Sequence, residues 1–209
     1  MNKLIMMPLL CSSFLFLLAC GSNKTNSKTL EQEVAQANTQ KTISQSYRVE
    51  TIAQFNEPWA ITSLPDQRLL ITERKGQLKL FDPKTKSIVN VSGVPAVSYG
   101  GQGGLGDVIL HPDFQNNHWL YLSYASKGQD GYGAEISRAK LDLSNPAQPK
   151  LTDLKTIWQQ VPKVSGQGHY GHRMMFGPDG KLWVSSGERQ KFDPAQDMQS
   201  NLGKVLRLN

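Results

Sequence analysis

Two histidines and an arginine follow closely spaced glycines in the segment 166–173, GQGHYGHR. An imidazole with an unperturbed pKa of about 6.5 suits proton abstraction near neutral pH. His169 is therefore our candidate general base, and the alternative is a histidine that serves only packing or the surface. His169 and His172 are three residues apart, but no acidic residue or third histidine lies close by in the sequence to complete a metal site.

A second glycine-rich segment, 101–106, reads GQGGLG and satisfies the dinucleotide pattern G-x-G-x-x-G. That function requires a helix directly after the glycines, whereas the following residues DVILHPDF predict a strand. We therefore reject a dinucleotide site. The glycines let the backbone approach closely, either in a structural turn or around a ligand to which Gln102 is presented.

A third polar segment, 185–189, reads SSGER and leads towards the C-terminal LGKVLRLN. Glu188 and Arg189 are typical of a polar strand end that faces a channel. The alternative interpretation is an exposed surface ion pair, which contributes little.

The elements that must position these residues are predicted to be strands. Short runs of β-branched and aromatic residues are bounded by Gly, Pro, Asp and Asn, and no long helix is indicated. The predicted strands lie at 59–64, 68–73, 77–82, 118–125, 135–143, 172–177 and 181–186. This spacing favours an all-β sandwich, barrel or propeller.

An internal repeat selects the propeller. Pro-Asp pairs at Pro65, Pro112 and Pro178 each precede an apolar run. Since Pro presets φ and Asp caps a turn, each pair is typical of a turn between two strands of one blade. The first interval is close to a blade of about 40–50 residues, and the longer second one predicts a blade with an insertion near 127–168.

The first 46 residues are predicted to form two separate segments. A single lysine and an apolar stretch over 1–19 are typical of a signal peptide and too short for a membrane span of about 20 residues. Leu17-Leu18-Ala19-Cys20 resembles the lipobox of bacterial lipoproteins, which implies lipidation of Cys20 and a bacterial cell-envelope location, most naturally on the periplasmic face of the outer membrane. The alternative is an ordinary signal. Residues 20–46 are polar and predict a flexible tether, and 47–209 the folded domain.

Composition limits the remaining classes. Among 209 residues, 23 Lys and Arg against 17 Asp and Glu give a net charge of +6, but the basic residues form no run of five, so nucleic acid is not an expected partner. Cys11 and Cys20 are the two cysteines, so after signal cleavage and lipidation no thiol is left for a disulfide or zinc cluster.

Four segments in this order resemble the soluble pyrroloquinoline quinone-dependent sugar dehydrogenases, the glucose/sorbosone dehydrogenase family. They are PWAITSLPDQRLLITERKGQL, GQGGLGDVILHPDF, GHYGHRMMFGPDGKLWVSSGER and AQDMQSNLGKVLRLN, so the resemblance covers about residues 50–209. It implies a six-bladed propeller that oxidises the anomeric carbon of an aldose to a lactone. The electron acceptor beyond the quinone is not indicated.

The resemblance also implies roles for individual residues. His169 matches the histidine that takes the sugar proton, and Gln102 matches a glutamine that contacts cofactor or sugar. Arg189 stands where the glucose enzymes have the glutamine of a Gly-Asp-Gln segment, and with Gln102 it is assigned to cofactor binding. Gly168 stands where the glucose enzymes have an acid, which puts the sugar's identity in question more than the reaction.

The family pattern continues beyond what this sequence contains. The expected arginine segment and calcium ligands are absent from it, and about twelve strands would make roughly half of a six-bladed ring. We therefore expect a truncated or incompletely recorded chain that is inactive alone. The competing hypothesis is a non-catalytic propeller segment that binds sugar or a protein partner.

Overall fold

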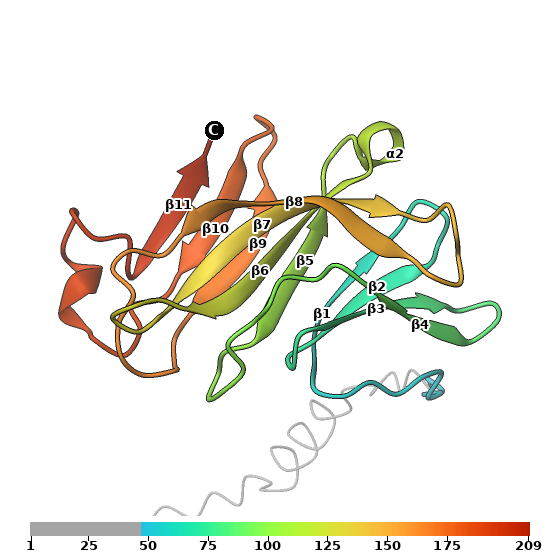
Figure 1. Cartoon of the computed structure of the whole chain (residues 1–209), viewed down its shortest axis with the longest axis horizontal. Coiled ribbons are helices and arrows are strands. Elements are labelled where there is room, and N and C mark those ends of the chain that lie inside the picture. The colour runs from blue at the N-terminus through green and yellow to red at the C-terminus, as the bar shows by residue number, and fades with distance from the viewer. Residues whose placement is uncertain (1–46) are drawn as a thin grey trace, which may run out of the picture. The chain divides into compact units, whose positions relative to one another are not determined.

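The computed structural model describes residues 47–209. The predicted signal peptide, the lipidation site Cys20 and the tether over 20–46 lie outside the described residues. Glu50–Asn209 forms one compact unit, drawn in colour in Figure 1. No helix among the residues described is long and apolar enough to cross a membrane.

The regular secondary structure of the described residues is almost entirely strand, as the sequence predicts (Figure 1). Its eleven strands are β1 (Pro58–Ser63), β2 (Leu69–Glu73), β3 (Gln77–Asp82), β4 (Ser87–Val91), β5 (Leu105–Leu110), β6 (Trp119–Lys127), β7 (Tyr132–Asp142), β8 (Lys150–Gln159), β9 (Gly171–Phe176), β10 (Leu182–Ser186) and β11 (Lys204–Leu208). The short helix α2 (Phe114–Asn117) and a 3-10 turn, η1 (Asp193–Ala195), complete it.

The strands form three antiparallel sheets in which neighbours in sequence are neighbours in space. The first sheet has the order β1-β2-β3-β4, the second β5-β6-β7-β8 and the third β9-β10-β11. The first strand of each sheet packs against the first strand of the next, β1 against β5 and β5 against β9. Meandering sheets that meet along their first strands are the arrangement of a β-propeller, so the predicted fold class is confirmed.

The repeat marked by the Pro-Asp pairs is confirmed as well. Pro65, Pro112 and Pro178 each lie between the first and second strands of their sheet. Asp66 accepts a hydrogen bond from the Arg68 N–H at 3.0 Å, and Asp179 does the same for Lys181 at 3.1 Å, which closes both turns.

The interval near 127–168 holds regular structure rather than an insertion. The two longest strands of the domain, β7 and β8, pair along most of it, and the remainder is the β8–β9 connection. Most residues of β8 are exposed, which removes the apolar alternation by which a half-buried strand is recognised. That is why the sequence pattern did not indicate this strand.

Two apolar clusters fill the spaces between neighbouring sheets. One cluster lies between the first and second sheets and includes Leu70, Leu78, Leu105 and Leu122. The other, with Ile136, Met174 and Val184, joins the second sheet to the third. This packing fixes the sheets relative to one another and so fixes the connections at their ends.

Candidate functional site

The three polar segments singled out in the sequence meet at one end of the sheets. In an antiparallel meander successive connections alternate between the two ends. The β2–β3, β4–β5, β6–β7, β8–β9 and β10–β11 connections therefore share one end, and the Pro-Asp turns and α2 lie at the other (Figure 1). Gln102, His169 and Glu188 lie in or beside three connections of the first group.

Gln102 joins the β4–β5 connection to the β8–β9 connection. Its side-chain Oε1 accepts the backbone N–H of His169 at 2.7 Å, and its own N–H donates to the Gln167 carbonyl at 2.8 Å. None of the described residues hydrogen-bonds the side-chain nitrogen of Gln102. The glycines before β5 thus form a loop, as expected, and the following strand confirms that this is no dinucleotide motif.

The imidazole of His169 is paired with the carboxylate of Glu188. The distance from His169 Nδ1 to Glu188 Oε1 is 2.5 Å, and the second carboxylate oxygen accepts the Gln190 N–H at 2.7 Å. The hydrogen bond from His169 holds the pKa of Glu188 below its usual value. The His169 side chain stays 47% exposed, so it is accessible to a ligand while its orientation is fixed.

This pairing determines which nitrogen of His169 can act as a base. A carboxylate at Nδ1 favours the tautomer with the proton on Nδ1, which leaves the lone pair of Nε2 to accept a proton. No described residue hydrogen-bonds Nε2. The site therefore offers an oriented proton acceptor, with the amide of Gln102 beside it as a hydrogen-bond donor.

Glu188 is the functional residue whose role the sequence did not reveal. The interpretation of Glu188 and Arg189 as a surface ion pair is wrong, since Glu188 pairs with His169 and Arg189 is buried with 0% exposure. The pairing joins residues 19 apart in sequence. Only the register of β9 against β10 brings them together, and the sequence pattern does not encode that register explicitly.

Arg189 does not reach the surface of the site. Its guanidinium hydrogen-bonds the carbonyls of Gly166, Gly168 and Tyr132. Its assignment to cofactor binding therefore stays a prediction, and the hydrogen bonds seen here indicate a different role, taken up below.

His172 occupies a different environment from His169. It is buried with 2% exposure, stacks on Trp59 at 5.2 Å between ring centroids and shares a 2.8 Å hydrogen bond with Ser123 Oγ. Burial lowers its pKa from 6.5 to about 4, so it is neutral at physiological pH. His172 is a packing histidine, and no group of three potential metal-binding side chains occurs among the residues described.

Arg74 supports the loop that carries Gln102. Its guanidinium donates to the carbonyls of Gly101 and Gly103 and lies 5.3 Å from the centre of the Tyr99 ring. Lys75 lies 5.7 Å from the same ring, and Tyr99 donates to Glu57 at 2.9 Å. Arg74 and Lys75 lie 3.4 and 3.9 Å from the Glu57 carboxylate, so these residues place two cations, one carboxylate and an aromatic face beside Gln102.

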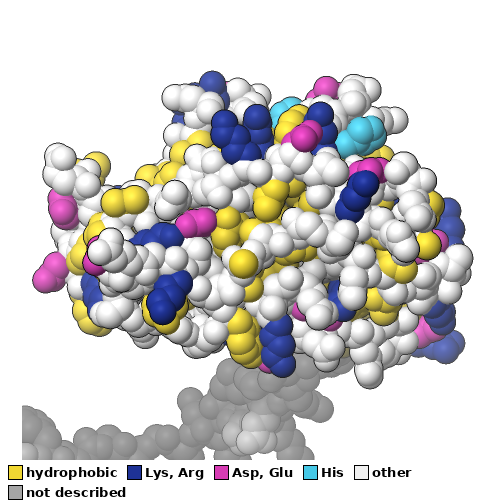
Figure 2. Space-filling view, viewed as in Figure 1, with side chains coloured by type: hydrophobic (Ala, Val, Ile, Leu, Met, Phe, Trp, Pro, Cys, Tyr) yellow, Lys and Arg dark blue, Asp and Glu magenta, His cyan; other side chains and the backbone are white. Residues whose placement is uncertain are grey.

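Elsewhere the charges are dispersed. On the face shown in Figure 2, Lys and Arg side chains lie in several separate places with Asp and Glu among them, and exposed histidines lie beside α2, at the end opposite the site. This distribution agrees with the absence of basic runs in the sequence.

Known proteins match the part of the chain that carries this site. The family model described as Glucose / Sorbosone dehydrogenase matches residues 55–209. The chain is 39% identical over 158 residues to Aldose sugar dehydrogenase YliI of Escherichia coli (strain K12), a match that covers 74% of this chain and 41% of that protein.

Solved structures give the same result. A glucose dehydrogenase superposes with a TM-score of 0.73 at 34% identity, covering 78% of this chain and 51% of its own. The PQQ-bound form of an aldose sugar dehydrogenase from Streptomyces coelicolor gives 0.68 at 32% identity, covering 77% and 47%. The chain thus spans about half the length of these proteins or less.

Proposed function

Because the chain belongs to the glucose/sorbosone dehydrogenase family, we propose that its protein is an oxidoreductase that oxidises the anomeric carbon of an aldose to the lactone, with pyrroloquinoline quinone as cofactor. The observation that carries the proposal is the hydrogen-bonded set Gln102, His169 and Glu188. Support comes from the relatives, one an aldose sugar dehydrogenase and another with PQQ bound. Since the chain covers less than half of the curated relatives, the activity is proposed for the whole protein.

The residues present fit one side of a quinone site. Pyrroloquinoline quinone is a planar tricarboxylate, so its site needs cations for the carboxylates and N–H donors for the quinone oxygens. Arg74 and Lys75 share the single Glu57 carboxylate and so leave a net positive charge beside the Tyr99 ring, and Gln102 has an amide nitrogen without a described partner. We propose that these residues and His169 hold the cofactor and sugar from this side.

In the reaction, His169 Nε2 accepts the proton of the anomeric hydroxyl. The Glu188 carboxylate orients the ring through Nδ1 and stabilises the imidazolium that forms, while the Gln102 amide donates to an oxygen of sugar or cofactor. When bound, the quinone supplies the two-electron acceptor for the hydride of the anomeric carbon. Loss of this proton and hydride converts the aldose to its lactone.

Calcium and the membrane anchor complete the proposal. We propose that the whole protein also binds calcium, for which we assign no ligand within residues 47–209. We also propose that Cys20 carries the lipid and holds the protein in the bacterial cell envelope, on the periplasmic face of the outer membrane.

The test is sugar-dependent dye reduction by the protein as its gene encodes it, supplied with pyrroloquinoline quinone and calcium. Glucose and other aldoses should each be tried, with the Escherichia coli relative assayed in parallel. Lactone formation with stoichiometric dye reduction supports the proposal. Sugar binding without any turnover, while the relative is active, would favour the non-catalytic alternative instead.

A further inference from the structure

Arg189 is a fully buried arginine next to the residue that orients the candidate base. It has 0% exposure, and none of the ion pairs within residues 47–209 includes it. Transfer of a cation from water to a protein interior without an anionic partner is unfavourable unless hydrogen bonds replace its hydration. Its burial beside Glu188 therefore points to a specific local function.

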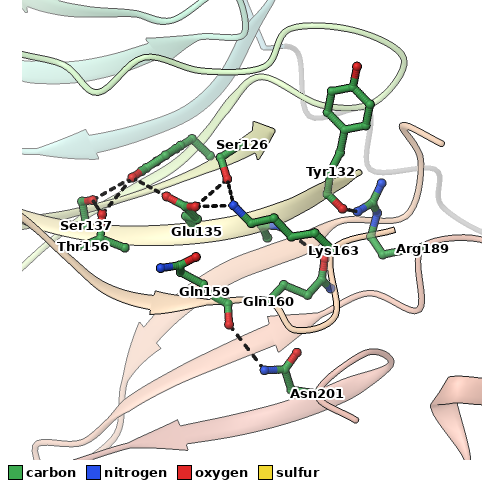
Figure 3. A network of polar contacts seen from close by, with 12 residues as sticks. Ser126, Tyr132, Glu135, Ser137, Thr156, Gln159, Gln160, Lys163, Arg189 and Asn201 are labelled. Atoms are coloured by element: carbon green, nitrogen blue, oxygen red, sulfur yellow. Dashed lines mark hydrogen bonds and ion pairs between the residues drawn. The ribbon is translucent and has the colours of Figure 1, made fainter. Parts of the chain in front are cut away.

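The guanidinium is satisfied by backbone carbonyls and an aromatic face. Nε donates to the Gly168 carbonyl at 2.8 Å, Nη2 donates to Gly166 at 2.6 Å, and Nη1 donates to Tyr132. The Cζ atom of Arg189 lies 3.8 Å from the centre of the Tyr170 ring, which is a cation–π contact. The three carbonyls belong to the loop before His169 and to the start of β7, and Figure 3 shows Arg189 beside Tyr132.

Only an arginine can make this set of contacts. Its planar fork presents donors in several fixed directions, whereas a lysine has one compact ammonium on a flexible stem. Without the fork, the buried carbonyl of Gly168 and the exposed residue Gly166 would both lose the donor that ties them to Arg189. The loop would then be held by fewer contacts at the point where it reaches His169.

The rest of the β8–β9 connection is anchored to the second sheet. Gln160 is buried, accepts the Ala134 N–H at 3.2 Å, and donates to Ser186 Oγ at 2.9 Å and to the Gly187 carbonyl at 2.8 Å. Lys163 pairs with Glu135 at 2.5 Å (Figure 3). Arg189 and Gln102 thus hold the two sides of the Gly168–His169 peptide, Arg189 at the Gly168 carbonyl and Gln102 at the His169 N–H.

The backbone around the pair needs this support. His169 has φ 47° and Arg189 has φ 61°, and this left-handed region is unfavourable for residues other than glycine. The Gly187 N–H donates to the Tyr170 carbonyl at 2.9 Å, and the Arg189 N–H donates to His169 at 3.3 Å. The segments that carry His169 and Glu188 are therefore held in register from both sides.

We propose that Arg189 is a positioning residue: its guanidinium fixes the loop 166–168 so that the imidazole of His169 meets Glu188, and it does not contact the cofactor. The effect on turnover rests on the proposed function. The effect on the loop and on the His169–Glu188 pair does not.

The first experiment therefore measures geometry without activity. We compare the wild type with Arg189→Lys and Arg189→Gln, using hydrogen exchange of the segment 160–170 and the NMR resonances of the His169 ring. Glu188→Gln defines the spectrum of an imidazole whose Nδ1 no longer faces a carboxylate, and Arg207→Lys, in an exposed pair at the other end of the sheets, is the matched control. Both Arg189 variants should exchange at least about tenfold faster in this segment and shift the His169 resonances towards those of Glu188→Gln.

The second experiment uses the reaction. Arg189→Lys should lower kcat by about tenfold or more with the dissociation constant of the quinone within about threefold of the wild type, because misplacement of a catalytic group affects turnover more than binding. The double variant with Glu188→Gln should be no slower than Glu188→Gln alone, since Arg189 acts through that pair.

Several results would overturn the proposal. These are unchanged His169 resonances and loop exchange in both Arg189 variants, a tenfold weaker quinone affinity with kcat retained, or global unfolding of both variants. The last outcome would make Arg189 a determinant of the whole fold. If no sugar is oxidised by any form, the proposed function fails, and the geometric measurements still decide the role of Arg189.

Discussion

His172 gives the clearest prediction about stability because it lies where the three sheets meet. Its ring stacks on Trp59 of β1 and shares a hydrogen bond with Ser123 of β6, and a Cβ on Gly106 of β5 would overlap it. Burial lowers the pKa of His172 to about 4, and the nearby charges of Arg173 and Arg189 act in the same direction.

The sign of the pH dependence follows from that shift. Between pH 6.5 and 4 the unfolded chain binds a proton at His172 that the folded chain does not. The contribution of neutral His172 to the free energy of unfolding is therefore fully present above pH 6.5. It is lost progressively as the pH drops through this window. A difference of about 2.5 pKa units corresponds to about 3 kcal/mol, of which about 2 kcal/mol is lost by pH 5.

Urea unfolding of the wild type and of His172→Gln at pH 7, 6 and 5 measures this contribution. Glutamine keeps a polar contact for Ser123 but does not titrate, and other titrating groups affect both proteins alike. Between pH 7 and 5 the wild type should lose about 2 kcal/mol more than the variant. His118→Gln, at an exposed position, should follow the wild type. Parallel pH profiles for the wild type and His172→Gln would refute the reasoning.

Two further predictions concern the anchor and the inner strands. Labelled fatty acid should enter the wild type in a bacterial host and be absent from Cys20→Ser, and a wild type that takes up no label would exclude the lipobox. Asp107 is buried and accepts hydrogen bonds from Val108, Met174 and Arg173, so Asp107→Asn should lower the free energy of unfolding by about 2–3 kcal/mol in urea. Asp179→Asn, at an exposed pair, should change it by less than about 1 kcal/mol, and equal losses would contradict this account.

Local rules predicted much of the fold. The Pro-Asp turns depend on a few adjacent residues, so their repeat predicts the blades from local sequence alone. The strand β8 was not indicated, because an outer strand exposed along most of its length shows no apolar alternation.

The site was predicted only in part for a related reason. Gln102 and His169 were recognisable by their glycine-rich surroundings, and the structure brings them together. The partnership of His169 with Glu188 depends on strand register, and the burial of Arg189 runs against the usual exposure of arginine. The His169–Glu188 pair and the burial of Arg189 both depend on tertiary contacts, so no short stretch of the sequence predicts them.

A comparison of His169→Gln with His172→Gln at pH 7.5 tests most directly whether His169 is the general base. In the protein encoded by the complete gene and loaded with quinone and calcium, His169→Gln should lower turnover by about 10² or more with quinone affinity nearly unchanged. His172→Gln, which alters packing away from the exposed imidazole, should reduce turnover far less. Equal loss of turnover in both variants, or loss of quinone binding in His169→Gln, would contradict the assignment.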